Sequence, residues 1–211
     1  RHAYDRDKQA CLEKMEALGY PLYVKPASLG SSIGISRVED KAALEDAIQL
    51  AFSYDRKVVV EKGVADAMEI NCSVLGLGDD CKASLCEKPL GWKDFLTFED
   101  KYLRQGKGKN ASGRQIPAPI GEAMTEKIQT LAKQIFTEMD CKGVVRIDFL
   151  VDNRTNELYV NEINTIPGSL AFYLWEAAGT SFTALLDEML SLAFKRARER
   201  EALTFTYESN I

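Results

Sequence analysis

The sequence is nearly devoid of histidine: its single copy, His2, lies at the extreme N-terminus of 211 residues. This lack excludes a Ser-His-Asp triad, a Cys-His pair and a zinc site with histidine ligands. Any chemistry that the chain performs must therefore rest on carboxylates, cations, backbone amides and bound metal.

Cysteine is present but lacks the spacing of a structural site. The chain has five cysteines, an odd number, and none of them belongs to a CxxC pair. We therefore expect free thiols in a reducing cytoplasm, and neither a disulfide framework nor a zinc site.

Long apolar runs and excess positive charge are also missing. No apolar run approaches the ~20 residues that span a bilayer. A formal net charge of −5 argues against nucleic acid or an anionic membrane as the main partner. The contents of 45% hydrophobic and 28% charged residues are those of a soluble globular protein.

Hydrophobic periodicity predicts an α+β protein in two parts. Residues 1–64 predict a small unit with helices at 5–18 and 41–54 and strands at 21–25, 33–38 and 57–61. Gly19 suits the end of the first helix and Asp40 the start of the second. Residues 65–211 predict a larger unit with strands at 69–77 and 82–87, helices at 121–139 and 181–199, and a hairpin at 144–168. A polar segment at 88–119 is long enough to be a functional or disordered loop.

The hairpin at 144–168 carries the most informative polar pattern. Side chains two apart on a strand share a face, so Arg146 lies beside Asp148, and Glu162 beside Asn164. Antiparallel pairing of the two strands would gather these four side chains. Two carboxylates and one amide oxygen suit Mg²⁺, which prefers few protein ligands plus substrate oxygens. The alternative is a hairpin whose polar face is simply solvated.

Three shorter motifs suit nucleotide binding, although each also fits a structural role. The small residues at 29–34 (LGSSIG) offer backbone N–H groups to phosphate oxygens, and Lys25 before them adds a cation. A strand ends at Glu61 to Val64. Its free backbone donor and acceptor groups suit the edge of an adenine; the alternative is a plain linker between the two units. Glu69 begins the next strand and could hold ribose hydroxyls.

The polar segment contains the sequence FLTFEDKYLRQGKGK, which places Lys101 and Tyr102 close to glycines. This composition is typical of a lid that closes over a site and excludes water. An exposed flexible loop is the alternative.

Taken in order, these motifs resemble the ATP-grasp ligases, and within them the D-alanine–D-alanine ligases. The matching segments are VKPASLGSSIG, VVVEKGV with Glu69 downstream, FEDKYL, VVRIDFLVD and NEINTIPG. Their order and spacing carry the resemblance, which touches almost the whole chain. It implies an ATP-grasp fold with two α+β lobes that hold ATP between them.

The resemblance also implies a role for each matching residue. Lys25 and the loop residues Gly30, Ser31 and Ser32 match the residues that contact the ATP phosphates. The adenine is matched by Glu61, Lys62 and Val64, and the ribose by Glu69. The spacing from Glu61 to Glu69 is one residue longer than is usual in the family. Lys101 and Tyr102 match the lid pair, whose tyrosine meets the loop serine, here Ser31. Asp148, Glu162 and Asn164 match the Mg²⁺ (or Mn²⁺) ligands, and Arg146 and the Gly168 amide match the groups that stabilise an oxyanion.

The implied activity is ATP-dependent synthesis of D-alanyl-D-alanine through an acyl phosphate, for peptidoglycan. Two departures from the family are evident. The family's N-terminal domain, through which its homodimers largely form, does not match this chain, so we expect a fragment that folds but is inactive alone. The family's serine at the second substrate's carboxylate is replaced by Tyr173, followed by Leu174. A ligase with another acceptor, or a nucleotide-binding module without ligase activity, therefore remains an alternative.

Overall fold

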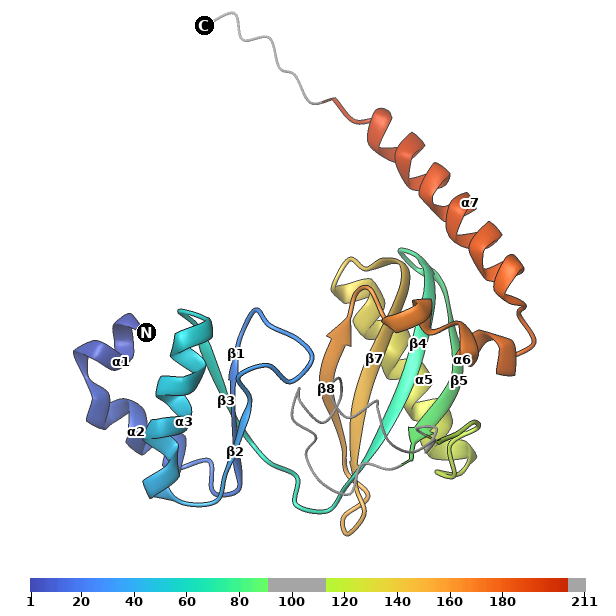
Figure 1. Ribbon diagram of the computed structural model, residues 1–211. Coiled ribbons are helices and arrows are strands. Elements are labelled where there is room, and N and C mark those ends of the chain that lie inside the picture. The colour runs from blue at the N-terminus through green and yellow to red at the C-terminus, as the bar shows by residue number, and fades with distance from the viewer. Residues whose placement is uncertain (91–112, 205–211) are drawn as a thin grey trace, which may run out of the picture. The chain divides into compact units, whose positions relative to one another are not determined.

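A computed structural model describes residues 1–90 and 113–204 (Figure 1). The described residues divide into two compact units, residues 1–66 and residues 67–90 together with 113–204. Within these ranges, no helix combines the length and the apolar composition that crossing a membrane requires.

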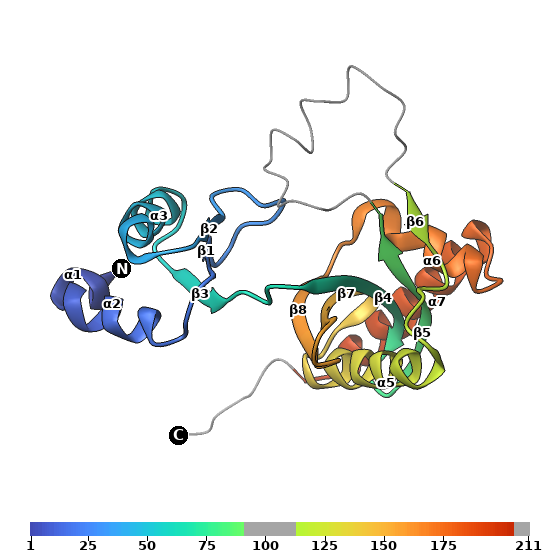
Figure 2. The ribbon, with the colours of Figure 1, turned by 90° about the horizontal axis from the view of Figure 1, so that it is seen from below.

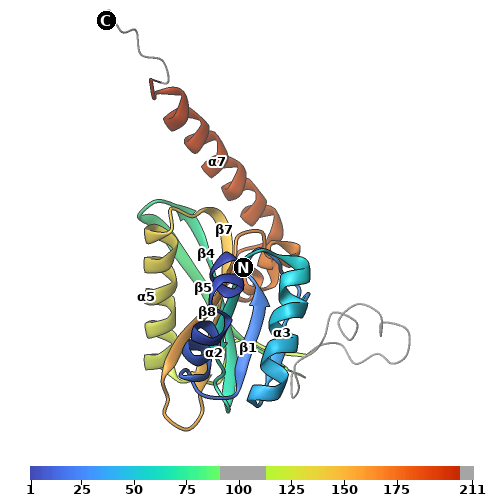
Figure 3. The same cartoon turned by 90° about the vertical axis from the view of Figure 1, so that its left-hand side faces the viewer.

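The first unit is a three-stranded antiparallel sheet covered by a helix. Its elements are α1 (His2–Arg6), α2 (Lys8–Glu16), β1 (Leu22–Pro26), β2 (Ser36–Val38), α3 (Lys41–Tyr54) and β3 (Val58–Lys62), and the strand order is β2-β1-β3. The helix α3 lies beside β1 (Figure 3), and Leu44 and Ile48 are buried in one cluster with Leu22 and Val24. As predicted, Asp40 caps α3, because its carboxylate accepts a hydrogen bond from the backbone N–H of Ala43.

Two predictions for this unit were wrong. The single helix expected at 5–18 is split at Asp7, whose side chain accepts a hydrogen bond from the N–H of Ala10 and starts α2. A residue that caps a helix has non-helical backbone angles, so the helical periodicity continues while the helix itself breaks. Ile33, expected in a strand, lies in a turn, and β2 begins only at Ser36.

The second unit is a five-stranded antiparallel sheet in the order β6-β5-β4-β7-β8. Its elements are β4 (Ala67–Leu77), β5 (Asp80–Pro89), β6 (Arg114–Gln115), α5 (Glu122–Glu138), β7 (Lys142–Asp152), β8 (Leu158–Asn164), the 3₁₀ turn η1 (Gly168–Ala171), α6 (Phe172–Ala177) and α7 (Phe182–Glu201). The helix α5 covers one face of this sheet, and η1, α6 and α7 lie on the other (Figure 2).

The predicted alternation on the central strand β7 is confirmed. Val145, Ile147 and Phe149 are buried in the apolar layer beneath α5. Their neighbours Arg146 and Asp148 therefore project from the opposite face of the sheet. Because β7 pairs with β4 on one side and β8 on the other, this polar face lies in the middle of the sheet.

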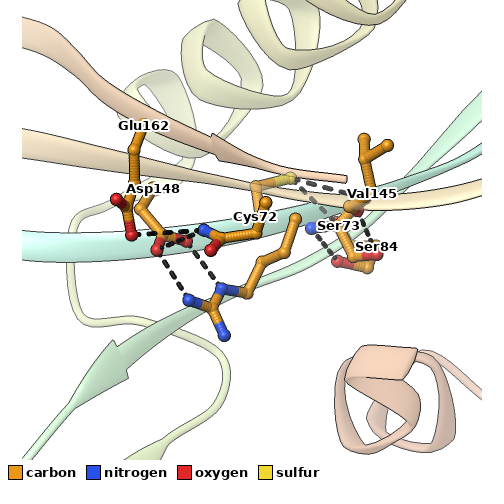
Figure 4. A network of polar contacts seen from close by, with 8 residues as sticks. Cys72, Ser73, Ser84, Val145, Asp148 and Glu162 are labelled. Carbon is orange, nitrogen blue, oxygen red and sulfur yellow. Dashed lines mark hydrogen bonds and ion pairs between the residues drawn. The ribbon is translucent and has the colours of Figure 1, made fainter. Parts of the chain in front are cut away.

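A buried hydrogen-bond network attaches α6 to this second face. The indole N–H of Trp175 donates to Ser73 Oγ (3.1 Å), and Ser73 Oγ donates to the carbonyl of Val145 (2.8 Å). Ser84 Oγ accepts from the Ser73 N–H at 2.9 Å (Figure 4). The network holds the helix that carries Tyr173 close to the sheet.

We predict that Ser73→Ala destabilises the chain by about 1–3 kcal/mol, because it leaves the buried indole N–H of Trp175 without an acceptor. Urea unfolding followed by tryptophan fluorescence measures this loss. The matched control is Ser53→Ala, which removes an exposed hydroxyl that donates to Leu50 within α3. Equal unfolding midpoints for the two variants would show that the network does not stabilise the fold.

Candidate active site

A row of polar side chains crosses the second face of the large sheet. Glu87 on β5 pairs with Asn71 on β4, Asn71 with Asp148 on β7, and Asp148 with Glu162 on β8. Opposite residues on antiparallel strands place their side chains on the same face, so the four form one line. Three of them, Glu87, Asn71 and Asp148, are almost fully buried. A buried row of this kind requires polar or ionic partners.

Arg146 donates two charged hydrogen bonds to Asp148, a member of this row. Arg146 Nε and Nη2 donate to Asp148 Oδ1 and Oδ2, each at 2.6 Å. Asn164, which pairs with Arg146 across the strands, donates from Nδ2 to Asp148 Oδ2 at 2.8 Å. The structure therefore brings together the four hairpin side chains that the sequence predicted, with Glu162 at 3.4 Å from Asn164 Nδ2 (Figure 4).

Burial and pairing shift the pKa of both groups. Burial raises the pKa of Asp148, and the hydrogen bonds and charge of Arg146 only partly oppose that effect. Burial would lower the pKa of Arg146, but the hydrogen bonds and charge of Asp148 raise it above its ordinary value. A further cation beside Asp148 would favour its ionised form.

The donor set fits a divalent cation that prefers oxygen. In the described ranges, no cluster of three or more histidine, cysteine or acidic side chains is gathered for a metal. The candidates are instead two carboxylates, Asp148 and Glu162, and the amide of Asn164. Asn164 now turns its nitrogen toward Asp148, so its amide must rotate to present oxygen. Few protein ligands with room for substrate oxygens are typical of Mg²⁺.

Glu69 and Asn71 extend the cluster along β4. With its amide nitrogen turned toward the acids, Asn71 lies 3.2 Å from Glu69 Oε1 and 3.1 Å from Asp148 Oδ1. Burial, followed by the charge of Asp148, raises the pKa of Glu69 to about 7. The sequence reading missed Asn71, although it follows Glu69 by two residues and therefore shares its face of the strand.

Tyr173 lies beside a second pair of charged residues that the sequence reading also missed. The guanidinium of Arg114 stacks 3.7 Å from the centre of the Tyr173 ring. Arg114 Nε is 3.5 Å from Glu87 Oε1. Burial, followed by the charge of Glu87, raises the pKa of Tyr173, while Arg146 opposes this. The next residue, Leu174, is fully buried.

Gly168 opens a turn with unusual backbone. Ser169, Leu170 and Ala171 follow it with φ of 52°, 56° and 50°, in the left-handed region. This region costs a residue with a β-carbon about 1–2 kcal/mol, so the surrounding structure must enforce it. The turn packs beside β7, the strand of Arg146.

The first unit holds most of the residues assigned to ATP. Lys25 on β1 forms an ion pair with Glu61 on β3, with Nζ and Oε2 separated by 2.6 Å. Lys62 ends β3 and Val64 follows it. Gly30 precedes a turn in which Ser31 and Ser32 have φ of 55° and 61°. The two lid residues, Lys101 and Tyr102, lie outside the described residues.

The raised pKa of Glu69 predicts a pH-dependent stability. The folded chain holds the Glu69 proton up to a pH of about 7, whereas the ordinary value is 4.5, so stability falls as pH rises between them. Without nucleotide or divalent metal, the free energy of unfolding of Glu69→Gln, taken relative to that of wild type, should therefore rise by about 2–3 kcal/mol from pH 5 to pH 8. Unfolding in urea at both pH values measures the gain.

The control for this prediction is Glu126→Gln, which changes an exposed carboxylate of α5. Its free energy of unfolding should follow that of wild type at both pH values. A Glu69→Gln variant that also follows wild type would contradict the assignment of the raised pKa.

Comparison with known proteins identifies the family. The family model described as D-ala D-ala ligase C-terminus matches residues 1–191. The D-alanine–D-alanine ligase of Thermosipho africanus is 43% identical over 93% of this chain and 52% of that protein. The corresponding ligase of Solibacter usitatus is 39% identical over 95% of this chain and 61% of its own length.

Solved structures agree with this comparison. The D-alanine–D-alanine ligase of Coxiella burnetii superposes with a TM-score of 0.73 at 31% identity, over 92% of this chain and 49% of that one. The VanG D-Ala:D-Ser ligase of Enterococcus faecalis gives a TM-score of 0.73 at 31% identity, over 88% and 53%. The chain thus spans about half the length of these relatives, and the α+β ATP-grasp fold expected from the sequence is confirmed. The chain belongs to the D-alanine–D-alanine ligase family and corresponds to its C-terminal part.

Proposed function

We propose that this chain provides the ATP- and metal-binding part of a cytoplasmic carboxylate–amine ligase that forms D-alanyl-D-alanine for peptidoglycan. The observation that carries the proposal is the set of hydrogen bonds that Asp148 accepts from Arg146 and Asn164, with Glu162 beside them. This constellation combines metal-binding oxygens with a guanidinium. The substrates are small molecules, and the complete enzyme is a homodimer.

The reaction requires two transfers. The carboxylate of a first D-alanine attacks the γ-phosphorus of ATP, which gives an acyl phosphate and releases ADP. The amine of a second D-alanine, after loss of a proton, attacks the acyl carbon and forms an oxyanion. Loss of a second proton from its nitrogen and collapse of this species release phosphate and leave the peptide bond. Mg²⁺ held by Asp148, Glu162 and Asn164 would neutralise charge on the phosphoryl oxygens.

Arg146 is suited to the oxyanion because only part of its guanidinium is engaged. Nε and Nη2 donate to Asp148, which fixes the plane of the group. The rest of the guanidinium, which also interacts with Tyr173, is assigned to face a developing negative charge, and the Gly168 amide is assigned as the second donor. A preorganised donor of this kind contributes roughly 3–4 kcal/mol in other enzymes.

The remaining residues are assigned to ATP and to the lid. Lys25 and the loop Gly30, Ser31 and Ser32 bind phosphates, Glu61, Lys62 and Val64 contact the adenine, Glu69 holds the ribose, and Lys101 and Tyr102 close the site, the latter against Ser31. Two observations support the ATP assignment: the small side chains of the loop and the Lys25–Glu61 ion pair, which links β1 to β3. Tyr173 and Leu174 are assigned to the second substrate.

A ligase with another acceptor is the second candidate. It is favoured by Tyr173, which is bulkier than the family's serine and stacks against Arg114. A D-serine, D-hydroxy acid or other amine acceptor would use the same phosphoryl chemistry.

The test is phosphate release from ATP by the full-length gene product that includes this chain. The substrates are D-alanine alone, D-alanine with D-serine, D-alanine with D-lactate, and no amino acid. D-alanine alone should give phosphate and dipeptide in equal amounts. Release only with a second compound would transfer the proposal to that acceptor, and Mg·ATP binding without release would favour a nucleotide-binding module.

We predict that Arg146→Ala lowers kcat by about 10²–10³-fold, the usual effect of removing an oxyanion donor. The Kd for Mg·ATP, measured by calorimetry, should change far less, because the proposed role concerns the oxyanion. The control Arg37→Ala removes a partly exposed guanidinium of β2 that pairs with Glu39. Equal losses of turnover and ATP binding would refute the role given to Arg146.

A further inference from the structure

The end of the polar row beyond Asn71 holds a buried carboxylate that the proposed mechanism leaves without a role. Glu87 is 3% exposed, on the same face of the sheet as Asp148. Its Oε1 is 3.5 Å from Arg114 Nε, and its Oε2 is buried without a hydrogen-bond partner. A buried carboxylate with one unsatisfied oxygen is costly, so it is usually retained for a purpose.

Arg114 differs from Arg146 in how its guanidinium is used. Arg146 donates two hydrogen bonds of 2.6 Å to Asp148. Among the described residues, 1–90 and 113–204, Arg114 forms an ion pair from Nε to Glu87, and this contact of 3.5 Å is longer than those of Arg146. Its side chain is 41% exposed, and its Cζ lies over the Tyr173 ring, 3.7 Å from the ring centre. The contact with the ring and the ion pair through Nε leave the two η nitrogens as the donors that can meet a ligand.

A guanidinium held in this way matches one class of ligand. A guanidinium held in a plane binds a carboxylate through two parallel hydrogen bonds, which a lysine or a neutral donor cannot reproduce. Tyr173, against which the guanidinium lies, is the residue that we assign to the second substrate. The acceptor of an amino-acid ligase carries a carboxylate that takes no part in the reaction and must be held.

We propose that Arg114 binds the carboxylate of the acceptor amino acid and that Glu87 is a positioning residue that orients Arg114 and Tyr173. This inference rests on the proposed function, since it concerns the second substrate of the same reaction. Recognition of a free carboxylate then comes from a cation stacked on an aromatic ring. Arg114 stacks on the ring of Tyr173, and this role would account for a tyrosine at the position where the family has a smaller serine.

The first experiment is a competition between two acceptors that differ only in the carboxylate. The full-length gene product receives ATP, D-alanine and D-alaninamide, and mass spectrometry measures the ratio of D-alanyl-D-alanine to D-alanyl-D-alaninamide. Arg114→Gln should shift this ratio toward the amide by about 10- to 100-fold, the worth of a charged hydrogen-bonded pair. An unchanged ratio would overturn the proposal, even if total turnover falls.

The matched control is Arg154→Gln. Arg154 also lies 3.5 Å from a nearly buried acid, Asp152, but at the turn of the hairpin between β7 and β8. Its loss should leave the product ratio at the wild-type value. A shift equal to that of Arg114→Gln would show a general effect of lost charge and would contradict a specific site.

Glu87→Gln tests the positioning role. The variant keeps the shape of the side chain but lets the guanidinium of Arg114 drift, so the KM for the acceptor should rise and the KM for ATP should not. The product ratio should move in the same direction as in Arg114→Gln, and by less. A loss of kcat alone, with KM and ratio unchanged, would mean that Glu87 only supports the fold.

A binding measurement separates failure of this inference from failure of the proposed function. The ¹⁵N-labelled full-length gene product is titrated with D-alanine and with D-alaninamide, and the shifts of the Arg114 Nε–H and the Trp175 indole N–H are followed. D-alanine should shift both signals and saturate, the amide should not, and Arg114→Gln should abolish the response. If D-alanine fails to shift the Arg114 signal, the inference is refuted, whatever the phosphate assay shows. If it does and no dipeptide forms, the proposed ligase activity alone is refuted.

Discussion

The buried contact between Arg146 and Asp148 is the constraint around which the second unit is arranged. Two hydrogen bonds of 2.6 Å hold the carboxylate, and Asn164 donates a third at 2.8 Å. A buried ion pair contributes little net stability, because both charges lose their hydration. Its value is geometric, because a bidentate pair fixes the directions of both side chains. Burial raises the pKa of Asp148 even though the carboxylate is paired.

The sheet makes this arrangement possible by separating its two faces. Apolar residues of β4 and β7 pack against α5, and this layer contains Phe136, Ile147 and Phe149, each fully buried. The opposite face carries polar groups beneath η1 and α6, and Trp175 of α6 donates a hydrogen bond to Ser73 on this face. The Trp175–Ser73 hydrogen bond anchors this cover. Stability thus comes mainly from one face, and the chemistry is assigned to the other.

The polar row joins two sites with different demands. At one end, Asp148 and Glu162 offer oxygens to a cation, and burial raises the pKa of Asp148, which a bound cation would oppose. At the other end, Glu87 supports Arg114 and Tyr173 at the proposed acceptor site. Asn71 lies between Glu69 and Asp148 and can donate to both. A sheet with fixed register is suited to this task, since a slip of one residue would send every member to the apolar face.

The sequence by itself determined the parts that depend on local periodicity and chemistry. Alternation on the two strands of the hairpin predicted that Arg146, Asp148, Glu162 and Asn164 share a face, and a two-strand turn brings such residues together without further information. The lack of histidine restricted the chemistry in the same way. Local reasoning failed at Asp7, because helical spacing continues across a residue that caps a new helix.

Only the tertiary structure decided which distant strands are neighbours. Nothing in the spacing of Asn71, Glu87 and Asp148 indicates that they form one line; that depends on the order β5-β4-β7 and on its register. The stacking of Arg114 on Tyr173 likewise joins a short edge strand to a helix far along the chain. These contacts are non-local, so they follow from how the whole sheet buries its apolar face, which no single segment encodes.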